Sequence, residues 1–410
     1  MPIEIAWTAI SQGPNAIPFW PYIKSYAPWF VVIYFLKRFF SGTQNTWERD
    51  MHGRVVMVTG GTSGMGAAVV EDLAKRGAQI ILLVKSLSDG WLVEYIADLR
   101  RNSGNNLIYA EEVDLSSLYS IRLFATEWLD NSPARRLDMV ICCAGLLQPP
   151  LKQRMLTADG IEAHWGINYV GHFHLLTLLS PSFRVQPPDR DVRIILSGCS
   201  TYVLADFDVT DPEFKNRGYP SSKPWRSFGS AKLALLIFLR QFQRTLDEYK
   251  RPDGNANNVR VFMANPGFVR TATSRNFISL GSLWGLLVYL IMWPIWWLVL
   301  KSPVQGAQTI LHVAMSPECA HGQGGKVYNE CREVTRKSPR KEVEDEELSK
   351  KLWDITAKQI EESERRGAAQ RKLDAESQKT TEKGKTATTP ATPATSATST
   401  AAKKTSTKKE

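Results

Sequence analysis

The chain has 410 residues, of which 43% are hydrophobic and 22% charged, and its formal net charge is +10. This balance fits one sizeable α/β core with non-globular ends. It argues against a nucleic-acid binder, because much of the excess positive charge lies in the C-terminal tail and no basic face is interleaved with aromatic residues. The cysteines are odd in number and lack metal-ligand spacing, so we expect no metal site and a reducing compartment. They are Cys142, Cys143, Cys199, Cys319 and Cys331.

Residues 1–50 form a segment that is unusual for a soluble enzyme. Ile17–Phe40 is rich in aromatic and aliphatic residues. A cleavable signal peptide is not expected, because the segment lacks a basic start and contains several prolines. Its uninterrupted apolar run, Ala27–Leu36, is shorter than the roughly 20 residues that a membrane-spanning helix needs. We therefore expect an interfacial or re-entrant membrane anchor, with a helix packed on the domain's own surface as the alternative.

The stretch Arg54–Gly66, RVVMVTGGTSGMG, indicates an anion site. Val55–Val58 is a short β-branched run typical of a buried strand. Glycines then open a helical pattern that stops at Gly77. Glycines between a strand and a helix N-terminus let the backbone approach a pyrophosphate, whose charge the free N–H groups and the helix dipole hold. A tight glycine turn without a ligand is the alternative.

Apolar runs separated by helical patterns follow, which predicts a doubly wound, mainly parallel sheet with ligands at the carboxyl ends of its strands. The further predicted strands are Gln79–Val84, Leu107–Val113, Leu137–Cys142, Val192–Leu196, Val259–Ala264 and Gly325–Tyr328.

One stretch, Leu280–Leu300, departs from this alternation. It carries no charge, contains four tryptophans and has the length of a transmembrane helix. A single crossing would put two halves of one domain on opposite sides of the membrane. Pro294 favours a bent segment that enters and leaves one leaflet. We expect a membrane insert at about residues 278–301, with a buried core helix as the alternative.

The chain's C-terminal end changes composition after Cys331. Glu344–Glu362 keeps a weak helical period, and we assign a C-terminal helix to residues 336–366. Residues 367–410 are rich in Thr, Ala, Pro, Ser and Lys, which predicts a disordered basic tail able to contact acidic lipid head groups.

The spacing Thr-Gly-x-x-x-Gly-x-Gly resembles the short-chain dehydrogenase/reductase family, and later motifs extend the resemblance over roughly residues 52–335, within an expected domain at 51–335. The nearest likeness is to its membrane-associated, retinol-dehydrogenase-like branch. The resemblance implies a Rossmann-type sheet and a nicotinamide dinucleotide. It implies cofactor contacts from Gly60, Thr62, Ser63, Gly64, Met65, Gly66, Lys85, Asp114, Ala144, Gly145, Lys232, Pro266, Gly267, Val269 and Thr271.

Cofactor choice is decided at the end of the second predicted strand. A carboxylate there binds the ribose of NAD, whereas a cation accommodates the 2′-phosphate of NADP. The chain has Lys85 at this point, and Asp89 comes late, so NADP (NADPH) is favoured; an ordinary exposed lysine is the alternative. The family's Asn-Asn-Ala-Gly is here Cys142-Cys143-Ala144-Gly145, which changes the local hydrogen bonding.

The family's hydride-transfer residues are Asn, Ser, Tyr and Lys. Asn168 and Lys232 match the first and last of them. For the serine, an ungapped reading gives Cys199, and one-residue shifts lead to Ser200 or toward Ser197; we prefer Ser200.

The tyrosine position breaks the family pattern. A lysine four residues after the tyrosine shares its helical face, and its charge favours the phenolate. Phe228, four residues before Lys232, stands where the tyrosine is expected. Tyr219 with Lys223 matches the bare motif, but prolines interrupt and follow that match, and a surface loop is its alternative reading.

Two functions remain open. The first is an NADP-dependent oxidoreductase acting on a lipophilic alcohol or carbonyl, such as a sterol, retinoid-like compound or long-chain aldehyde, at a membrane or lipid-droplet surface. We expect endoplasmic-reticulum or lipid-droplet residence, with the catalytic domain facing the cytosol. The second is a catalytically weak or inactive, membrane-bound dinucleotide-binding scaffold, which Phe228 favours.

Overall fold

The computed structural model describes residues 7, 11, 15 and 19–386, with side chains to residue 374. By its internal contacts the chain divides into two units, Met1–Glu364 and Arg365–Glu410. The first unit contains the sheet, the helices that cover it and the candidate site.

An eight-stranded sheet forms the centre of the first unit, in the order β3-β2-β1-β4-β5-β6-β7-β8. All neighbouring strands are parallel except β7 and β8. The doubly wound parallel sheet is therefore confirmed, and the short β8 is an addition to the predicted strands. The strands are β1 Val55–Thr59, β2 Gln79–Val84, β3 Ile108–Glu112, β4 Met139–Cys142, β5 Val192–Ser197, β6 Val259–Asn265, β7 Lys326–Asn329 and β8 Arg332–Glu333.

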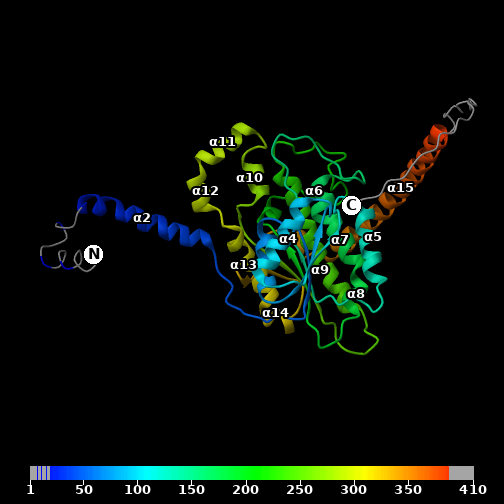
Figure 1. Ribbon diagram of the computed structural model, residues 1–410, viewed down its shortest axis with the longest axis horizontal. Helices are drawn as coiled ribbons and strands as arrows, with labels where there is room; N and C mark the ends of the chain where they lie inside the picture. The colour runs from blue at the N-terminus through cyan, green and yellow to red at the C-terminus, as the bar shows by residue number, and fades with distance from the viewer. Residues whose placement is uncertain (1–6, 8–10, 12–14, 16–18, 387–410) are drawn as a thin grey trace, which may run out of the picture. The chain divides into compact units, whose positions relative to one another are not determined.

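Helices cover both faces of this sheet (Figure 1). One apolar core lies between the sheet and α3 (Gly64–Lys75), α4 (Gly90–Ser103) and α13 (Pro303–Met315). The other core lies on the side of α5 (Leu118–Leu129), α7 (Gly171–Leu178) and α9 (Trp225–Glu248). Shorter elements complete the unit: α6 Ala163–Trp165, the π-helical turn η2 Gly166–Val170, α8 Ser180–Arg184, the 3₁₀ turns η3 Ser200–Leu204 and η4 Lys341–Val343, and α14 Glu318–His321.

The strand order reverses between β1 and β4, because β1 connects through β2 and β3 on one side and β4 leads to β5 and β6 on the other. In open α/β sheets, ligands bind in the crevice outside the carboxyl ends of the strands at such a switch point. The glycine turn after β1 and the loop after β4 meet there.

The predicted membrane insert forms three short helices, α10 Ala272–Ile278, α11 Leu283–Ile291 and α12 Trp293–Val299. Its two ends lie side by side, because Val269 and Lys301 form a parallel bridge. The Lys301 ammonium also pairs with Glu330 and donates to the Pro266 carbonyl at 3.2 Å. The chain thus leaves the domain and returns to it at one point.

Helices α11 and α12 are exposed. The alternative interpretation of this stretch, a helix buried in the core, is therefore wrong. Tyr289 is the one buried residue among them. Within the described part of the chain, no helix alone has the length and apolarity to cross a membrane. Helices α10 and α11 reach that composition together, but they are bent by 104°.

Helix α2, Trp20–Ser41, follows the N-terminal residues and has no buried residue. It contacts α12 of the insert: the Lys37 ammonium donates to the Trp297 carbonyl at 2.5 Å and lies 4.9 Å from the centre of its indole. The first two residues of the predicted segment Ile17–Phe40 lie outside the described residues. The apolar surface of α2 therefore adjoins the apolar surface of the insert.

Helix α15, Glu346–Thr386, is longer than the predicted C-terminal helix. In the first unit, Leu352 and Ile360 are buried and the indole of Trp353 stacks on Phe238. Residues 367–386 are helical, so the prediction of disorder from Gly367 is wrong for them. The reason is local: these residues are mostly Ala, Glu, Gln, Lys and Arg, which favour helix, and no proline lies between Gly367 and Pro390. The rest of the predicted tail, residues 387–410, lies outside the described residues.

Candidate active site

The turn from β1 into α3 depends on glycine. Gly60 has φ +66°, and a Cβ atom there would lie 2.7 Å from the Cα of Ala144 in the loop after β4. A side chain at Gly66 would overlap the carbonyl oxygen of Gly60. The turn therefore keeps its backbone open to the cavity at the N-terminus of a 12-residue helix, as a pyrophosphate site requires.

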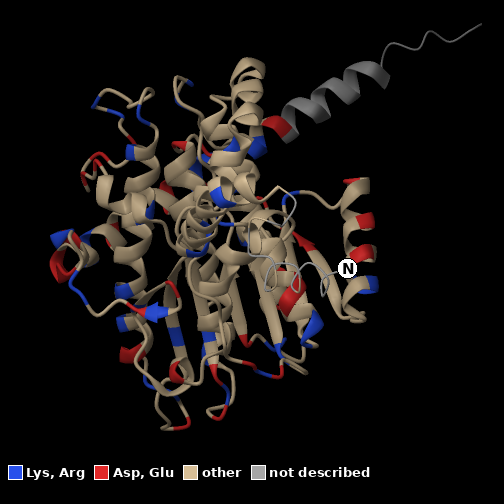
Figure 2. Cartoon of the chain, turned by 90° about the vertical axis from the view of Figure 1, so that its left-hand side faces the viewer, with Lys and Arg blue, Asp and Glu red and all other residues tan. Residues whose placement is uncertain are grey.

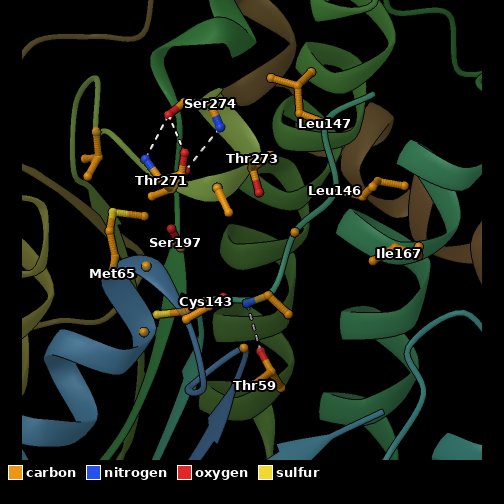
Figure 3. A pocket seen from close by; sticks show the side chains of 18 of the residues that line it. Thr59, Met65, Cys143, Leu146, Leu147, Ile167, Ser197, Thr271, Thr273 and Ser274 are labelled. Carbon is orange, nitrogen blue, oxygen red and sulfur yellow. Dashed lines mark hydrogen bonds between the residues drawn. The ribbon is translucent and has the colours of Figure 1, made fainter. Parts of the chain in front are cut away.

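A pocket of about 880 Å³ opens at this turn and runs along the carboxyl ends of the strands. All of the residues expected to hold the cofactor line it, from Gly60 through Lys85 and Asp114 to Thr271. Figure 3 shows Met65 and Cys143 on one side of this space and Leu146, Leu147 and Ile167 on the other. The predicted set is therefore brought together in one cavity, and its glycine cradle fits a dinucleotide.

In the loop after β4, where the family's asparagines are replaced by Cys142 and Cys143, a hydrogen bond from the backbone to Thr59 holds Ala144 against the end of β1. The Thr59 hydroxyl accepts from the Ala144 N–H at 3.2 Å and lies 3.3 Å from Nε2 of His172 (Figure 3 draws the first of these bonds). Burial, with the charge of Lys232, lowers the pKa of His172 to about 3, so its imidazole is neutral. Burial raises the pKa of Cys143 to about 12, so this pocket thiol stays protonated.

Asn168 lies in the π-helical turn η2 and is fully buried. Its side-chain oxygen accepts from the Leu146 N–H at 2.6 Å, and its amide donates to the Leu146 carbonyl at 2.8 Å. Asn168 itself does not line the pocket, whereas Leu146 does. Asn168 therefore holds the backbone of Leu146 in the pocket wall without lining the pocket itself.

Lys232 points from α9 into the pocket and is 5% exposed. Its ammonium donates to the Ser197 carbonyl at 2.9 Å, and burial lowers its pKa. Phe228 lines the same pocket one turn earlier on the helix. The ring beside Lys232 on this helix is therefore aromatic but carries no hydroxyl.

The preferred serine does not face the pocket. Ser200 begins the 3₁₀ turn η3, and its hydroxyl accepts from the Asn265 amide at 2.7 Å. Cys199 and Ser197 line the pocket instead. Strand β5 ends at Ser197, and the change of backbone conformation at η3 turns Ser200 toward the end of β6. The structure therefore brings Cys199 and Ser197, and not Ser200, to Lys232.

Tyr219 is also kept away from the lysine. Its hydroxyl donates to the buried carboxylate of Glu162 at 3.0 Å and lies 3.4 Å from Nδ1 of His164. Burial, followed by the charge of Glu162, raises the pKa of Tyr219, so the phenol stays protonated. Tyr219 does not line the pocket, and Lys223 of the same motif is exposed.

Sequence patterns did not identify the individual residues that form the apolar wall of the pocket. These aliphatic and aromatic side chains come from separate segments of the chain, and no local period marks them in the sequence. They are Leu146, Leu147, Leu204, Trp225, Phe268, Phe277, Ile278 and Leu300.

Comparison with known proteins agrees with this geometry. A family model described as short chain dehydrogenase matches residues 54–199. Human retinol dehydrogenase 14 is 32% identical over 322 residues, which cover 75% of this chain and 86% of that protein. The chain belongs to the short-chain dehydrogenase/reductase family. It falls in the retinol-dehydrogenase-like branch.

Two other proteins are also similar to this short-chain dehydrogenase/reductase over most of its length. An uncharacterized oxidoreductase of Schizosaccharomyces pombe, pbr1, is 43% identical over 366 residues, covering 89% of this chain and 97% of its own. Polyprenol dehydrogenase of Mus musculus is 32% identical, covering 73% of this chain and 82% of its own. Among solved structures, an uncharacterized protein from Mycobacterium paratuberculosis has a TM-score of 0.55 at 23% identity, covering 78% of this chain and 98% of its own, and supports the fold.

Family membership gives the pocket a ligand class. Short-chain dehydrogenase/reductases bind a nicotinamide dinucleotide, and the cradle around Gly60 and Gly66 is the part of this chain that a pyrophosphate fits.

Proposed function

We propose that this chain is an NADP-dependent oxidoreductase that interconverts a lipophilic alcohol and its carbonyl at a membrane or lipid-droplet surface. The observation that carries the proposal is the continuity of the pocket with the insert. Phe277 and Ile278 of α10, and Leu300 after α12, line the same pocket as Lys232. When bound, the dinucleotide supplies or accepts the hydride.

Lys85 supports the choice of NADP. It follows β2 directly, is 77% exposed on its side chain, and lies 3.4 Å from the Asp114 carboxylate. An exposed ammonium at this position can pair with a ribose 2′-phosphate. Asp89 also lines the pocket, so a carboxylate lies in the same region as Lys85. Replacing Asp89 tests whether this carboxylate affects the preference between NADP and NAD.

The apolar wall supports a lipophilic substrate. The part of the pocket wall that would contact the substrate is largely apolar, and its side chains include Leu147, Trp225 and Phe277. Relatives named for retinol and for polyprenol act on lipid alcohols, as their names state. A retinoid-like or polyisoprenoid alcohol, or the matching aldehyde, is the substrate class that this wall fits best.

Exposed apolar helices support the membrane surface. Large apolar side chains of α2, α11 and α12 are solvent-exposed, including Trp29, Phe30, Leu283, Trp284 and Ile291. Figure 2 views the side that carries the insert, whose α11 and α12 bear neither blue nor red residues. An exposed patch of this kind marks a membrane or protein contact. Because both ends of the insert meet at Val269 and Lys301, we propose insertion into one leaflet, with the domain on the cytosolic face of the endoplasmic reticulum or a lipid droplet.

A turnover assay tests the proposal. The full chain, reconstituted in phospholipid vesicles, is given retinoid, polyisoprenoid, sterol and long-chain alcohols with NADP⁺, and the aldehydes or ketones with NADPH. We expect turnover with at least one isoprenoid pair. Bound NADPH without turnover of any pair would instead favour the second candidate.

That second candidate is a catalytically weak or inactive dinucleotide-binding scaffold. Phe228 is the observation in its favour, because a phenyl ring beside Lys232 can neither donate nor accept the proton that the reaction moves.

A further inference from the structure

Two positively charged side chains lie against tryptophans of the insert. The Lys37 ammonium is 4.9 Å from the indole centre of Trp297 and donates to the carbonyl of that residue at 2.5 Å. The guanidinium carbon of Arg270 is 4.2 Å from the ring centre of Trp293. Both tryptophans belong to α12 and are four residues apart, so they share one face of the helix, about 6 Å apart along its axis. The two cations, one from α2 and one from the segment between β6 and α10, therefore meet at the same face of α12.

These two charges are not neutralised by the protein. Among the described residues, neither Lys37 nor Arg270 forms an ion pair with a carboxylate, whereas the neighbouring Lys301 pairs with Glu330. Neither α2 nor the stretch Leu280–Leu300 contains an aspartate or a glutamate. Burial, followed by the charge of Arg270, lowers the pKa of Lys37, so the two positive charges act on each other. An anion bound between them would offset this repulsion.

The dinucleotide pocket does not use these charges. Val269 and Thr271 line the pocket, but Arg270 between them does not, and neither does Lys37. The N–H of Arg270 donates to the Lys301 carbonyl at 2.9 Å, where the insert leaves and rejoins the domain. The two cations therefore belong to the base of the insert and not to the cofactor site.

The surroundings of the pair fit the head-group layer of a membrane. Trp293 and Trp297 are 42% and 44% exposed, and tryptophans beside apolar surface are typical of the membrane–water interface, the depth at which lipid phosphates lie. A guanidinium binds phosphate through paired hydrogen bonds, and an ammonium binds it as a point charge. A phosphate monoester carries about −1.5 to −2 charges at neutral pH, which matches two cations.

We propose that Lys37 and Arg270 together bind the phosphate of an anionic phospholipid, and that a phosphomonoester head group, as in phosphatidic acid, is the preferred ligand. This inference rests on the membrane contact in the proposed function.

Flotation of the full chain with vesicles of three compositions tests the site. The vesicles contain phosphatidylcholine alone, or phosphatidylcholine with phosphatidic acid or phosphatidylserine added to the same surface charge. We expect the wild type to bind the phosphatidic acid vesicles most tightly. A basic residue near an anionic membrane surface contributes about fivefold in affinity. Lys37→Gln with Arg270→Gln should therefore weaken binding to phosphatidic acid about thirtyfold and leave binding to phosphatidylcholine unchanged.

Three variants control the measurement. Lys37→Gln alone changes a helix that has no buried residue, so it tests the site without altering the core, and it should cost about fivefold. Lys37→Arg with Arg270→Lys keeps both charges and should retain most of the affinity. Lys24→Gln with Arg275→Gln removes the same charge from exposed positions of α2 and α10 and should keep the preference for phosphatidic acid over phosphatidylserine.

The outcomes separate the phosphate site from the membrane contact on which it rests. Equal wild-type binding to all three vesicles, or equal binding to the two anionic ones, overturns the phosphomonoester site while the membrane contact stands. A preference for phosphatidic acid that survives Lys37→Gln with Arg270→Gln also overturns it. Wild-type protein that floats with none of the vesicles removes both, and self-association of that protein would assign this face to contacts between copies of the chain.

Discussion

The ammonium nitrogen of Lys232 lies 5.8 Å from the centre of the Phe228 ring, one turn earlier in α9. Burial lowers the pKa of this lysine, whose hydrogen bond is to the Ser197 carbonyl. A phenol at position 228 would stand next to a buried positive charge, which favours its ionised form. A tyrosine at this position would therefore have beside it the positive charge that an acid–base phenol uses.

Replacing this ring with a phenol should therefore increase catalysis. We expect Phe228→Tyr to raise turnover of the lipid carbonyl at least about tenfold, because positioned acid–base catalysis is worth roughly 10² to 10⁴ in rate. Tyr219→Phe is the matched control and should change little, since its hydroxyl is bound to Glu162. Steady-state rates with NADPH measure both. Strong wild-type activity that Tyr219→Phe abolishes would refute the assignment of the active-site helix.

Lys85 should set the preference for the phosphorylated cofactor. Loss of a charge-assisted contact costs on the order of 1.5–3 kcal/mol, which is about ten- to a hundredfold in affinity. Lys85→Asp is expected to invert the preference of NADPH over NADH in titration calorimetry. Asp89→Asn is the companion variant, and it should leave the preference in place or increase it. Equal wild-type affinities for the two dinucleotides would contradict NADP selectivity.

Charges on the insert should weaken membrane association. Trp284 is 80% exposed and Ile291 71% exposed. An aspartate at bilayer depth costs about 2.5–3.5 kcal/mol. We expect Trp284→Asp combined with Ile291→Asp to move protein from the carbonate-washed membrane pellet to the supernatant. Leu123→Asp with Leu151→Asp adds the same charge at exposed sites outside the insert and should leave the protein in the pellet. Wild-type protein that is already soluble would disprove monotopic insertion.

Acid should destabilise the fold through His172. Its folded-state pKa is lowered from 6.5 to about 3, mainly by burial. Between these values the unfolded chain binds a proton that the folded chain does not, so the free energy of unfolding falls as the pH falls below 6.5. This group alone should cost about 2 kcal/mol at pH 5 relative to pH 8. Denaturant unfolding of wild type and His172→Gln at both pH values measures it, and identical pH dependence of the two would show that His172 makes no such contribution.

Much of the fold follows from short-range signals in the sequence. Runs such as Val55–Val58 and Gln79–Val84 are apolar and β-branched because both faces of a parallel sheet are covered, and the structure has strands there. The glycine pattern is equally local, because Gly60 has a positive φ and a Cβ at Gly66 would overlap the carbonyl oxygen of Gly60. Helix α15 extends beyond the predicted C-terminal helix, because the first part of the tail is rich in residues that favour helix although the composition of the whole tail does not.

The dinucleotide fold, the glycine cradle and the position of Lys232 could be predicted from the sequence, because each depends on residues within one strand, turn or helix. Which neighbours of that lysine face the pocket depends on tertiary contacts. A one-residue offset in a turn sends Ser200 to Asn265 and leaves Cys199 in the cavity. Tyr219 satisfies a motif as a string, yet the buried carboxylate of Glu162, 57 residues away in the chain, holds its hydroxyl outside the pocket. Side-chain direction at such positions depends on contacts distant in sequence, which spacing alone does not contain.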